Sequence, residues 1–261
     1  MDRLSDAQWS NYIKDGYLRL GIIDQETLEA LQTRIDDIML GTADVNYDRM
    51  LMQIDSEDGE HPGPQTKGHK GSTLNYRKIQ DLEWDPVFLK YMQRPLWKDV
   101  CERAYGKENS IACNRAMFMN KPSHRGTYLA WHQDRWPRLD RDPEVTIYTS
   151  LDPATIDNGC VRIVLGSHRT LLNPESQAGY LGPELEKNLK NESMEYLELE
   201  AGEVVLLHNW LVHSSGINQS SQSRRAFSVC YQDATTVDET GETYPIIFGK
   251  NALTTSNLNT P

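Results

Sequence analysis

The chain has 261 residues, of which 38% are hydrophobic and 25% charged, and its formal net charge is −11. This length is sufficient for one large domain with a substantial core, and the composition is that of an ordinary globular protein. The acidic balance argues against a nucleic-acid partner, because a negatively charged chain repels a phosphate backbone.

Membrane and secretory signals are not found in the sequence. No stretch approaches the roughly 20 apolar residues that span a bilayer, and the opening MDRLSDAQW has neither the basic nor the apolar region of a secretory signal. The four cysteines are widely spaced, without a C-x-x-C pair, so we expect them to be reduced and mostly buried. We therefore expect a soluble cytoplasmic protein with no membrane partner.

The first part of the chain, about residues 1–105, is predicted to form a layer of helices. Apolar residues recur at helical spacing on both sides of a short strand at 16–20, and again over 84–105. Asp24 and Gly41 suit the two ends of the second helix. Residues 41–75 lack periodicity and are rich in Asp, Glu, Gly and Pro. A loop of this length is usually functional or disordered, and we expect this one to act as a lid.

The second part, about residues 111–235, is predicted to be an antiparallel β core. Short β-rich runs alternate with turn residues, among them IACNRAMFM, VTIYTSL, CVRIVL, MEYLEL, EVVLLH and AFSVCYQ. Jelly rolls arrange such a strand set without long free edges. We predict a mainly β, double-stranded β-helix (jelly-roll or cupin-like) core with flanking α-helices, in a single domain over residues 1–261.

The stretch AWHQDRWP places His132 and Asp134 one residue apart. On a strand, residues i and i+2 point to the same face, so the imidazole and the carboxylate can meet at one metal ion. A third ligand must come from elsewhere. The segment GEVVLLHNWLVHSSG offers His208 and His213.

Two histidines and one carboxylate on one face of a metal are typical of non-haem Fe(II) oxygenases. If 2-oxoglutarate is the co-substrate, its far carboxylate needs a fixed cation, and arginine suits this because its planar fork holds a carboxylate through two hydrogen bonds. Arg224 and Arg225 follow in the next predicted strand. Adjacent strand residues face opposite ways, so only one of the two arginines can point inward.

Four segments, LSDAQWSNYIKDGYLRL, KPSHRGTYLAWHQD, DNGCVRIVLGSHR and LVHSSGINQSSQSRRA, give the chain a resemblance to the phytanoyl-CoA dioxygenase family of Fe(II)/2-oxoglutarate-dependent oxygenases. In that family the distal histidine precedes S-x-x-N-x-S or a close variant, and the 2-oxoglutarate arginine follows eleven residues later. His213 with Arg224 fits this spacing, whereas His208 would pair with Gln219. The resemblance implies that His132, Asp134 and His213 bind Fe(II).

The resemblance also implies a co-substrate site. Arg224 and Ser215 match the positions that bind the far carboxylate of 2-oxoglutarate, and Tyr148 falls where relatives place an aromatic residue beside it. Thr146 shares the face of Tyr148 by strand alternation. Leu165 departs from the family pattern, in which many relatives have proline, and this affects the shape of a loop.

Five further residues are candidates for binding substrate. Arg135 and Trp136 follow the predicted ligand Asp134 directly and are expected at the mouth of the pocket. Arg115 and Met117 share a face on the preceding strand. Arg115 either holds an anionic group of the substrate or pairs with a buried acid, since a core-facing arginine is rarely unpaired. Arg77 belongs to a second polar cluster, Tyr76-Arg77-Lys78, which follows the long loop.

The predicted function is hydroxylation of an unactivated C–H bond in a small polar metabolite or natural-product intermediate. The reaction uses Fe(II), 2-oxoglutarate and O2 and releases succinate and CO2. Halogenation is disfavoured, because related halogenases replace the carboxylate ligand with a small residue and Asp134 is present. The alternatives are the same chemistry on an acyl-CoA or a peptide, a desaturation, ring closure or epimerisation, a cupin-like isomerase or binding protein with a non-redox metal, and a catalytically silent scaffold.

Overall fold

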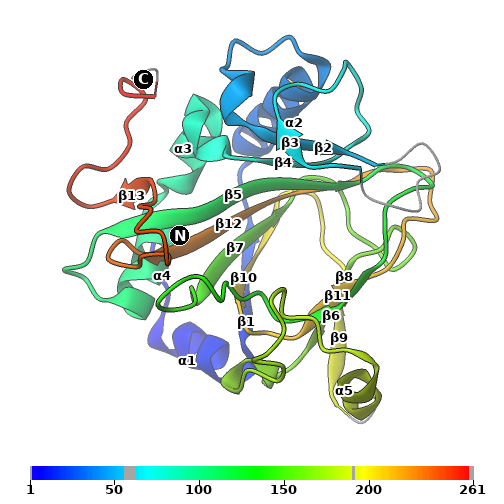
Figure 1. Ribbon diagram of the computed structural model, residues 1–261, viewed down its shortest axis with the longest axis vertical. Helices are drawn as coiled ribbons and strands as arrows, with labels where there is room; N and C mark the ends of the chain where they lie inside the picture. Colours follow the sequence, from blue (N-terminus) through cyan, green and yellow to red (C-terminus); the bar gives the residue numbers. More distant parts are fainter. Residues whose placement is uncertain (1, 56–62, 190–191, 259–261) are drawn as a thin grey trace.

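The computed structural model describes residues 2–55, 63–189 and 192–258, and two antiparallel sheets facing each other form the core of this part of the chain (Figure 1). The larger sheet has the order β1-β10-β7-β12-β5-β4-β2-β3, with β13 paired to β5. Its strands are β1 (Tyr17–Ile22), β2 (Leu51–Ile54), β3 (Thr66–Lys67), β4 (Tyr76–Gln80), β5 (Ile111–Lys121), β7 (Val145–Ser150), β10 (Glu203–His208), β12 (Arg224–Asp233) and β13 (Ile246–Phe248).

The smaller sheet has the order β6-β11-β8-β9. Its strands are β6 (Leu129–His132), β8 (Val161–Val164), β9 (Met194–Leu197) and β11 (His213–Ser215). From β5 to β12 the chain passes back and forth between the two sheets. This strand order is that of a double-stranded β-helix, so the predicted fold class is confirmed.

Helices cover the outer face of the larger sheet (Figure 1). They are α1 (Asp6–Asp15), α2 (Gln25–Leu40), α3 (Pro86–Met92) and α4 (Pro95–Tyr105), with α5 (Pro183–Asn188) beside the smaller sheet and the short 3-10 helices η1 (Tyr47–Arg49), η2 (Leu82–Trp84) and η3 (Ser167–Arg169). Phe88 of α3 packs on Phe227 of β12 with ring centroids 4.7 Å apart. Because Phe227 points outward, the alternate residues of β12, from Arg224 onward, point between the sheets.

The helix ends follow from local sequence. The Asp24 side chain accepts a hydrogen bond from the backbone N–H of Thr27, and Gly41 ends α2 in the left-handed conformation, as predicted. The predicted helix over 84–105 is in fact two helices. The break falls before Pro95, because proline disfavours helical backbone in the residue that precedes it, and Arg94 is extended (φ −62°, ψ 143°).

The expected loop over 41–75 is wrong in part. Residues 51–54 and 66–67 form β2 and β3, which extend the larger sheet beyond β4. The fully buried Met52 pairs with Ile79 of β4, and this burial stabilises a strand too short to give a periodic signal. Residues 56–62 lie outside the described part of the chain, and a lid role for the segment stays a prediction.

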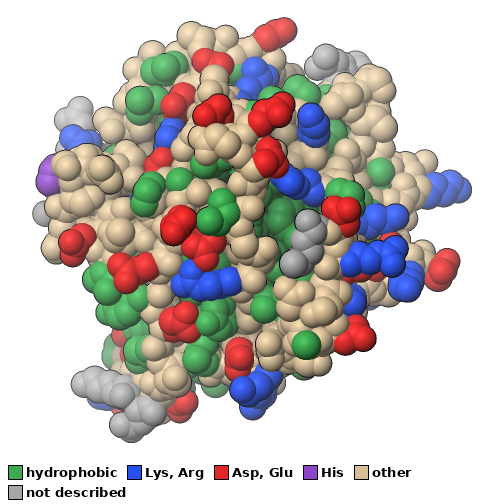
Figure 2. All heavy atoms as spheres, turned by 180° about the vertical axis from the view of Figure 1, so that it is seen from behind, with side chains coloured by type: hydrophobic (Ala, Val, Ile, Leu, Met, Phe, Trp, Pro, Cys, Tyr) green, Lys and Arg blue, Asp and Glu red, His purple; other side chains and the backbone are tan. Residues whose placement is uncertain are grey.

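Acidic and basic side chains are interspersed over the face of the molecule seen from behind (Figure 2). The negative net charge is therefore not collected into one patch on this face. Within the described ranges, no helix has the length and apolar character needed to cross a membrane.

Candidate metal centre and its pocket

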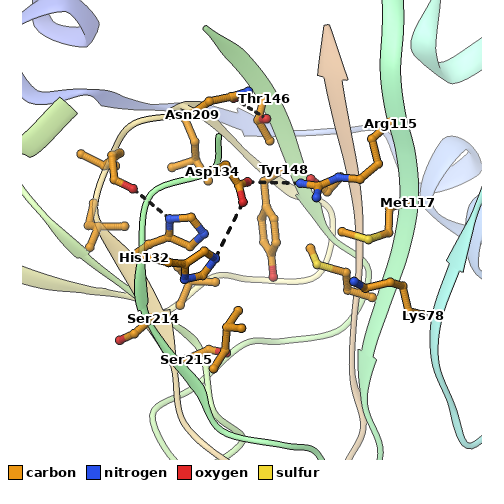
Figure 3. A pocket seen from close by; sticks show the side chains of 18 of the residues that line it. Lys78, Arg115, Met117, His132, Asp134, Thr146, Tyr148, Asn209, Ser214 and Ser215 are labelled. Atoms are coloured by element: carbon orange, nitrogen blue, oxygen red, sulfur yellow. Dashed lines mark hydrogen bonds and ion pairs between the residues drawn. The ribbon is translucent and has the colours of Figure 1, made fainter. Parts of the chain in front are cut away.

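Two histidines lie side by side in the smaller sheet. His132 ends β6, His213 begins β11, and the two residues are direct partners in the antiparallel ladder. Their ring centroids are 4.1 Å apart. With Asp134 they form a set in which one ligand atom of each residue lies within 4.8 Å of the others (Figure 3). The structure thus brings together the three side chains predicted to bind metal.

Asp134 reaches this cluster from a turn and not from a strand. β6 ends at His132, and the backbone N–H of Asp134 donates to the carbonyl of Asn209 at 2.8 Å. Between the two candidate ligands, the fully buried Gln133 donates from its side-chain amide to the carbonyls of Thr170 and Trp210. These bonds hold the turn, so His132 and Asp134 meet although strand alternation ends between them.

Hydrogen bonds set the tautomers of both histidines. Nδ1 of His132 lies 2.8 Å from the carbonyl of Ala130, and Nδ1 of His213 lies 2.8 Å from the carbonyl of Leu211. A carbonyl oxygen only accepts, so each Nδ1 carries the proton and each Nε2 keeps its lone pair for a metal.

Electrostatics favour the ligand forms of His132 and Asp134. Burial, followed by the nearby His213, lowers the pKa of His132 to about 4. Burial raises the pKa of Asp134, but Arg115 and the two histidines outweigh it and lower that pKa to about 2. At neutral pH His132 therefore offers a neutral nitrogen and Asp134 a carboxylate oxygen, and together with the imidazole of His213 this donor set fits a ferrous ion.

His208, the alternative third ligand, lies outside this cluster. It ends β10, and its Nδ1 accepts a hydrogen bond from the backbone N–H of Trp210 at 3.0 Å. Its ring lies 4.9 Å from that of His168, whose Nε2 bonds to the carbonyl of Ile13. Both histidines therefore have structural partners.

A cavity of about 350 Å³ between the two sheets contains the cluster. Every residue predicted to bind co-substrate or substrate lines it, namely Arg224, Ser215, Tyr148, Thr146, Arg115, Met117, Arg135, Trp136 and Arg77. Most of them come from alternate positions on the inner face of the larger sheet, which is the face that the helices leave uncovered.

The two consecutive arginines of β12 have different surroundings. Arg224 points into the cavity, is 4% exposed, and lies 3.4 Å from the hydroxyl of Tyr148. Its Nε has no hydrogen-bond partner among the described residues. Arg225 faces the other way and bonds to Asp152 and Asp36. A buried guanidinium with an unused donor suits a carboxylate ligand.

The polar groups near Arg224 differ in how much of their hydrogen-bonding capacity is left for a ligand. Ser215 is 3% exposed and, like Tyr148, lines the cavity. Thr146 also faces the cavity, but its hydroxyl donates to the side chain of Asn209 at 2.7 Å. Only the acceptor capacity of the Thr146 hydroxyl therefore remains for a ligand.

Arg115 pairs with an acid, and that acid is Asp134. Nη2 of Arg115 lies 3.1 Å from Oδ2 of Asp134 (Figure 3). The Arg115 guanidinium also lies over the Trp136 ring, 5.2 Å from its centroid. Arg115 thus holds a predicted metal ligand, so its acidic partner is a residue of the candidate metal centre itself.

Two lysines line the cavity that were not among the predicted substrate residues, although Lys78 stands in the polar cluster of Arg77. Arg77 lines the cavity, but its guanidinium lies 3.5 Å from Asp55 at one side. Its neighbour Lys78 extends into the cavity beside Met117 (Figure 3). Lys121 enters from the end of β5. The pairing of β4 with β5 and of β5 with β12 places both lysines, and this register cannot be read from one sequence.

The sequence matches one protein family and several curated members of it. A family model described as phytanoyl-CoA dioxygenase matches residues 12–226. A probable phytanoyl-CoA dioxygenase of Caenorhabditis elegans is 28% identical over 247 residues, which is 87% of this chain and 75% of that protein. The human peroxisomal phytanoyl-CoA dioxygenase is 26% identical over 168 residues, 60% of this chain and 49% of that protein. The chain thus spans about half the length of its mammalian relatives.

Solved structures share the fold. EctD from S. alaskensis superimposes with a TM-score of 0.72 at 19% identity, over 91% of this chain and 80% of that one. SnoK, a non-heme alpha-ketoglutarate-dependent carbocyclase of nogalamycin biosynthesis, superimposes with a TM-score of 0.69 at 17% identity, over 95% of each chain. At these identities the likeness concerns the fold.

Proposed function

The chain belongs to the phytanoyl-CoA dioxygenase family of Fe(II)- and 2-oxoglutarate-dependent oxygenases, and from this premise we propose that it hydroxylates an unactivated C–H bond of a small polar metabolite or natural-product intermediate. The observation that carries the proposal is one cavity holding both a His-Asp-His cluster and a buried arginine with an unused donor. When bound, iron and 2-oxoglutarate would supply the oxidising chemistry that places one atom of O2 in the C–H bond as a hydroxyl and the other in succinate, with release of CO2.

His132, Asp134 and His213 would hold the iron by their free Nε2 atoms and one carboxylate oxygen. Arg224 and Ser215 would bind the far carboxylate of 2-oxoglutarate, with Tyr148 beside it. The depth of this subsite supports the assignment, because Arg224 and Ser215 are 4% and 3% exposed and a charge-assisted hydrogen bond is strengthened where water is excluded.

The rest of the cavity supports a polar substrate, and in particular one with an acidic group. Among the described lining residues six are basic, Arg77, Lys78, Arg115, Lys121, Arg135 and Arg224, whereas Asp134 alone is acidic. Arg77 and Arg115 already lie beside Asp55 and Asp134. The two carboxylates of 2-oxoglutarate can balance only part of the remaining positive charge, and Nε of Arg135 has no partner in the described chain. Arg135 and Trp136 would meet the substrate near the opening.

Related outcomes use the same residues. One structural neighbour is described as a carbocyclase and another as an epimerase, so ring closure and epimerisation are alternatives to hydroxylation. An acyl-CoA or a peptide is an alternative substrate. A cupin-like isomerase or binding protein with a non-redox metal is the alternative from a different class, and it would make no use of Arg224.

The first test is an anaerobic titration of 2-oxoglutarate into Fe(II)-loaded protein, followed by visible absorbance. We expect a weak metal-to-keto-acid charge-transfer band that saturates with added 2-oxoglutarate. Iron binding without such a band would contradict the oxygenase assignment and favour the non-redox alternative. With the band established, release of succinate in the presence of small organic acids, each compared with its methyl ester, tests the substrate class.

A further inference from the structure

Lys121 lies directly across from Arg224, and both side chains enter the cavity from the same face of the larger sheet. β5 and β12 pair the two residues in register, and directly opposed residues of an antiparallel pair point to one side. Lys121 is 6% exposed and Arg224 is 4% exposed. Two cations placed in this way repel each other with little screening by water, unless an anion lies between them.

The surrounding chain holds Lys121 in this position. Its Nζ donates to the carbonyl of Thr127 at 2.6 Å. Gly126 packs against its stem, so closely that a Cβ at that glycine would lie 2.9 Å from Cβ of Lys121. The Asn218 amide donates to the carbonyls of Lys121 and Gln222, and so ties the end of β5 to the turn that leads into β12. The lysine is therefore part of a built site and not a mobile surface chain.

Charged groups reach Lys121 from three other segments. Arg224 of β12 and Arg77 of β4 repel a charge on Lys121, whereas Asp55, which directly follows β2, attracts it. Asp55 is shared, because it lies 3.5 Å from Arg77 and also faces Arg125. Among the described residues no carboxylate forms an ion pair with Lys121. Burial, then Arg224 and Arg77, lower the pKa of Lys121 to about 6, so at neutral pH the amine is mostly uncharged until an anion arrives.

We infer that Lys121 is a second ligand for the far carboxylate of 2-oxoglutarate, and that it takes up a proton from solvent when this co-substrate binds. The inference rests on the proposed function, because it takes Arg224 as the other partner of that carboxylate. The proton passes from the buffer to the lone pair of Nζ, and the resulting ammonium donates to the carboxylate. No covalent bond to carbon changes.

The physical reason is the charge balance of the subsite. A carboxylate placed between Arg224 and Lys121 offsets the repulsion that keeps the lysine neutral and favours its charged form. By linkage, proton uptake makes binding depend on pH: the affinity for 2-oxoglutarate falls by up to about tenfold per pH unit between the pKa values of Lys121 in the free and bound states. The subsite should thus bind this carboxylate more tightly at mildly acidic to neutral pH than at alkaline pH.

Calorimetry measures the proton directly. 2-Oxoglutarate is titrated anaerobically into Fe(II)-loaded protein at about pH 7 in buffers of different ionisation enthalpy, and the slope of the binding enthalpy against that enthalpy gives the number of protons taken up. We expect a slope of about 0.7–1 proton at pH 7, falling towards zero at about pH 5, where Lys121 is already charged.

Two variants of Lys121 and one matched lysine locate the proton. Lys121→Met should abolish the uptake and weaken 2-oxoglutarate binding about tenfold or more near neutral pH. Lys121→Arg should keep the affinity but lose both the uptake and its pH dependence, since arginine stays charged. Lys90→Met removes an exposed lysine of α3, outside the cavity, and should leave the uptake at Lys121 in place.

The outcomes separate this inference from the proposed function. Binding of 2-oxoglutarate with no proton uptake at neutral pH, or uptake that persists in Lys121→Arg, overturns the role of Lys121 and leaves the oxygenase assignment standing. Absence of 2-oxoglutarate binding to the iron-loaded protein overturns both. Loss of uptake in Lys121→Arg with the affinity retained supports the inference even if Lys121→Met does not fold.

Discussion

Arg115 holds one oxygen of Asp134 and leaves the other to the histidines. Its Nη2 lies 3.1 Å from Oδ2, whereas Oδ1 lies 3.7 Å from Nε2 of His132. The carboxylate is thus oriented with one oxygen towards the candidate metal position and the other tied to a fixed cation. A bound metal would then meet Asp134 through a single oxygen, which keeps a coordination position open.

This relationship predicts the effect of removing the arginine. Arg115→Gln should weaken Fe(II) binding by about 10- to 100-fold, the usual cost of losing a group that orients a metal ligand. Competition with a chelator of known affinity measures the change. Arg141→Gln, which alters an exposed arginine with ion-pair partners far from the cluster, is the matched control and should leave the iron affinity unchanged. An unchanged affinity in Arg115→Gln would refute the orienting role.

The two arginines of β12 give a second prediction. Arg224→Ala should abolish turnover of 2-oxoglutarate while leaving metal binding largely intact, because it removes the buried cation of the co-substrate subsite. Arg225→Ala should retain turnover but lose stability, by about 1–3 kcal/mol, since Asp152 and Asp36 lose their partner. Succinate release and denaturant unfolding separate the two effects. Full turnover in Arg224→Ala would favour the non-redox alternative.

The buried carboxyl of Glu83 leads to a prediction of how the free energy of unfolding depends on pH. Its carboxyl is buried, Oε2 has no hydrogen-bond partner in the described chain, and burial with nearby Asp81 raises its pKa from 4.5 to about 8. The folded state keeps a proton that the unfolded state releases, so this group lowers the stability progressively as the pH rises from about 4.5 to 8.

Glu83→Gln removes that titration and should stabilise the protein at about pH 8 by on the order of a few kcal/mol, with much less effect near pH 5. Urea midpoints at the two pH values measure the difference. Glu26→Gln, at an exposed position of α2, should change neither midpoint appreciably. Equal effects of Glu83→Gln at both pH values would show that the carboxyl is not the source.

Gly179, in the loop before α5, packs directly against the backbone of Gln133 at the metal cluster. A Cβ at this position would lie 1.8 Å from the carbonyl oxygen of Gln133, and its φ is +72°. Gln133 sits between two candidate ligands, and its backbone N–H donates to the Gly179 carbonyl at 3.1 Å. Gly179→Ala must therefore push the ligand turn away.

We expect Gly179→Ala to lower both the iron affinity and the melting temperature. Gly182→Ala is the control, because its φ is +75° but nothing lies within 4 Å of the added Cβ. That variant should cost only the strain of placing a side chain at this positive φ, about 1–3 kcal/mol, and should bind iron normally. Equal iron affinities in the two variants would show that the contact with Gln133 does not position the ligands.

Several features of the fold and of the candidate site can be predicted from short-range sequence patterns. The caps of α2, the alternation that sends Arg224 inward and Arg225 outward, and the clustering of His132, Asp134 and His213 all follow from spacing of a few residues and from family resemblance. Iron binding by these three side chains stays a prediction for the titration above.

Features that depend on long-range pairing could not be predicted. Lys78 and Lys121 enter the site because β4 pairs with β5 and β5 with β12, and no short-range pattern encodes that register. The strands β2 and β3 are too short for a periodic signal and exist because Met52 is buried against β4. Asn209 bonds to Asp134 through its carbonyl and to Thr146 through its side chain, contacts that only the folded chain brings together.

The direct pairing of His132 with His213 has a consequence for how the protein matures. The two residues are far apart in the chain and become neighbours only when β6 and β11 pair in the correct register. A slip of one residue would turn one imidazole to the opposite side of the sheet. An unfolded or misregistered chain therefore does not bring His132, Asp134 and His213 together at one point. Iron would be captured late, by chains whose smaller sheet is already correctly closed, and would then stabilise that register against slippage.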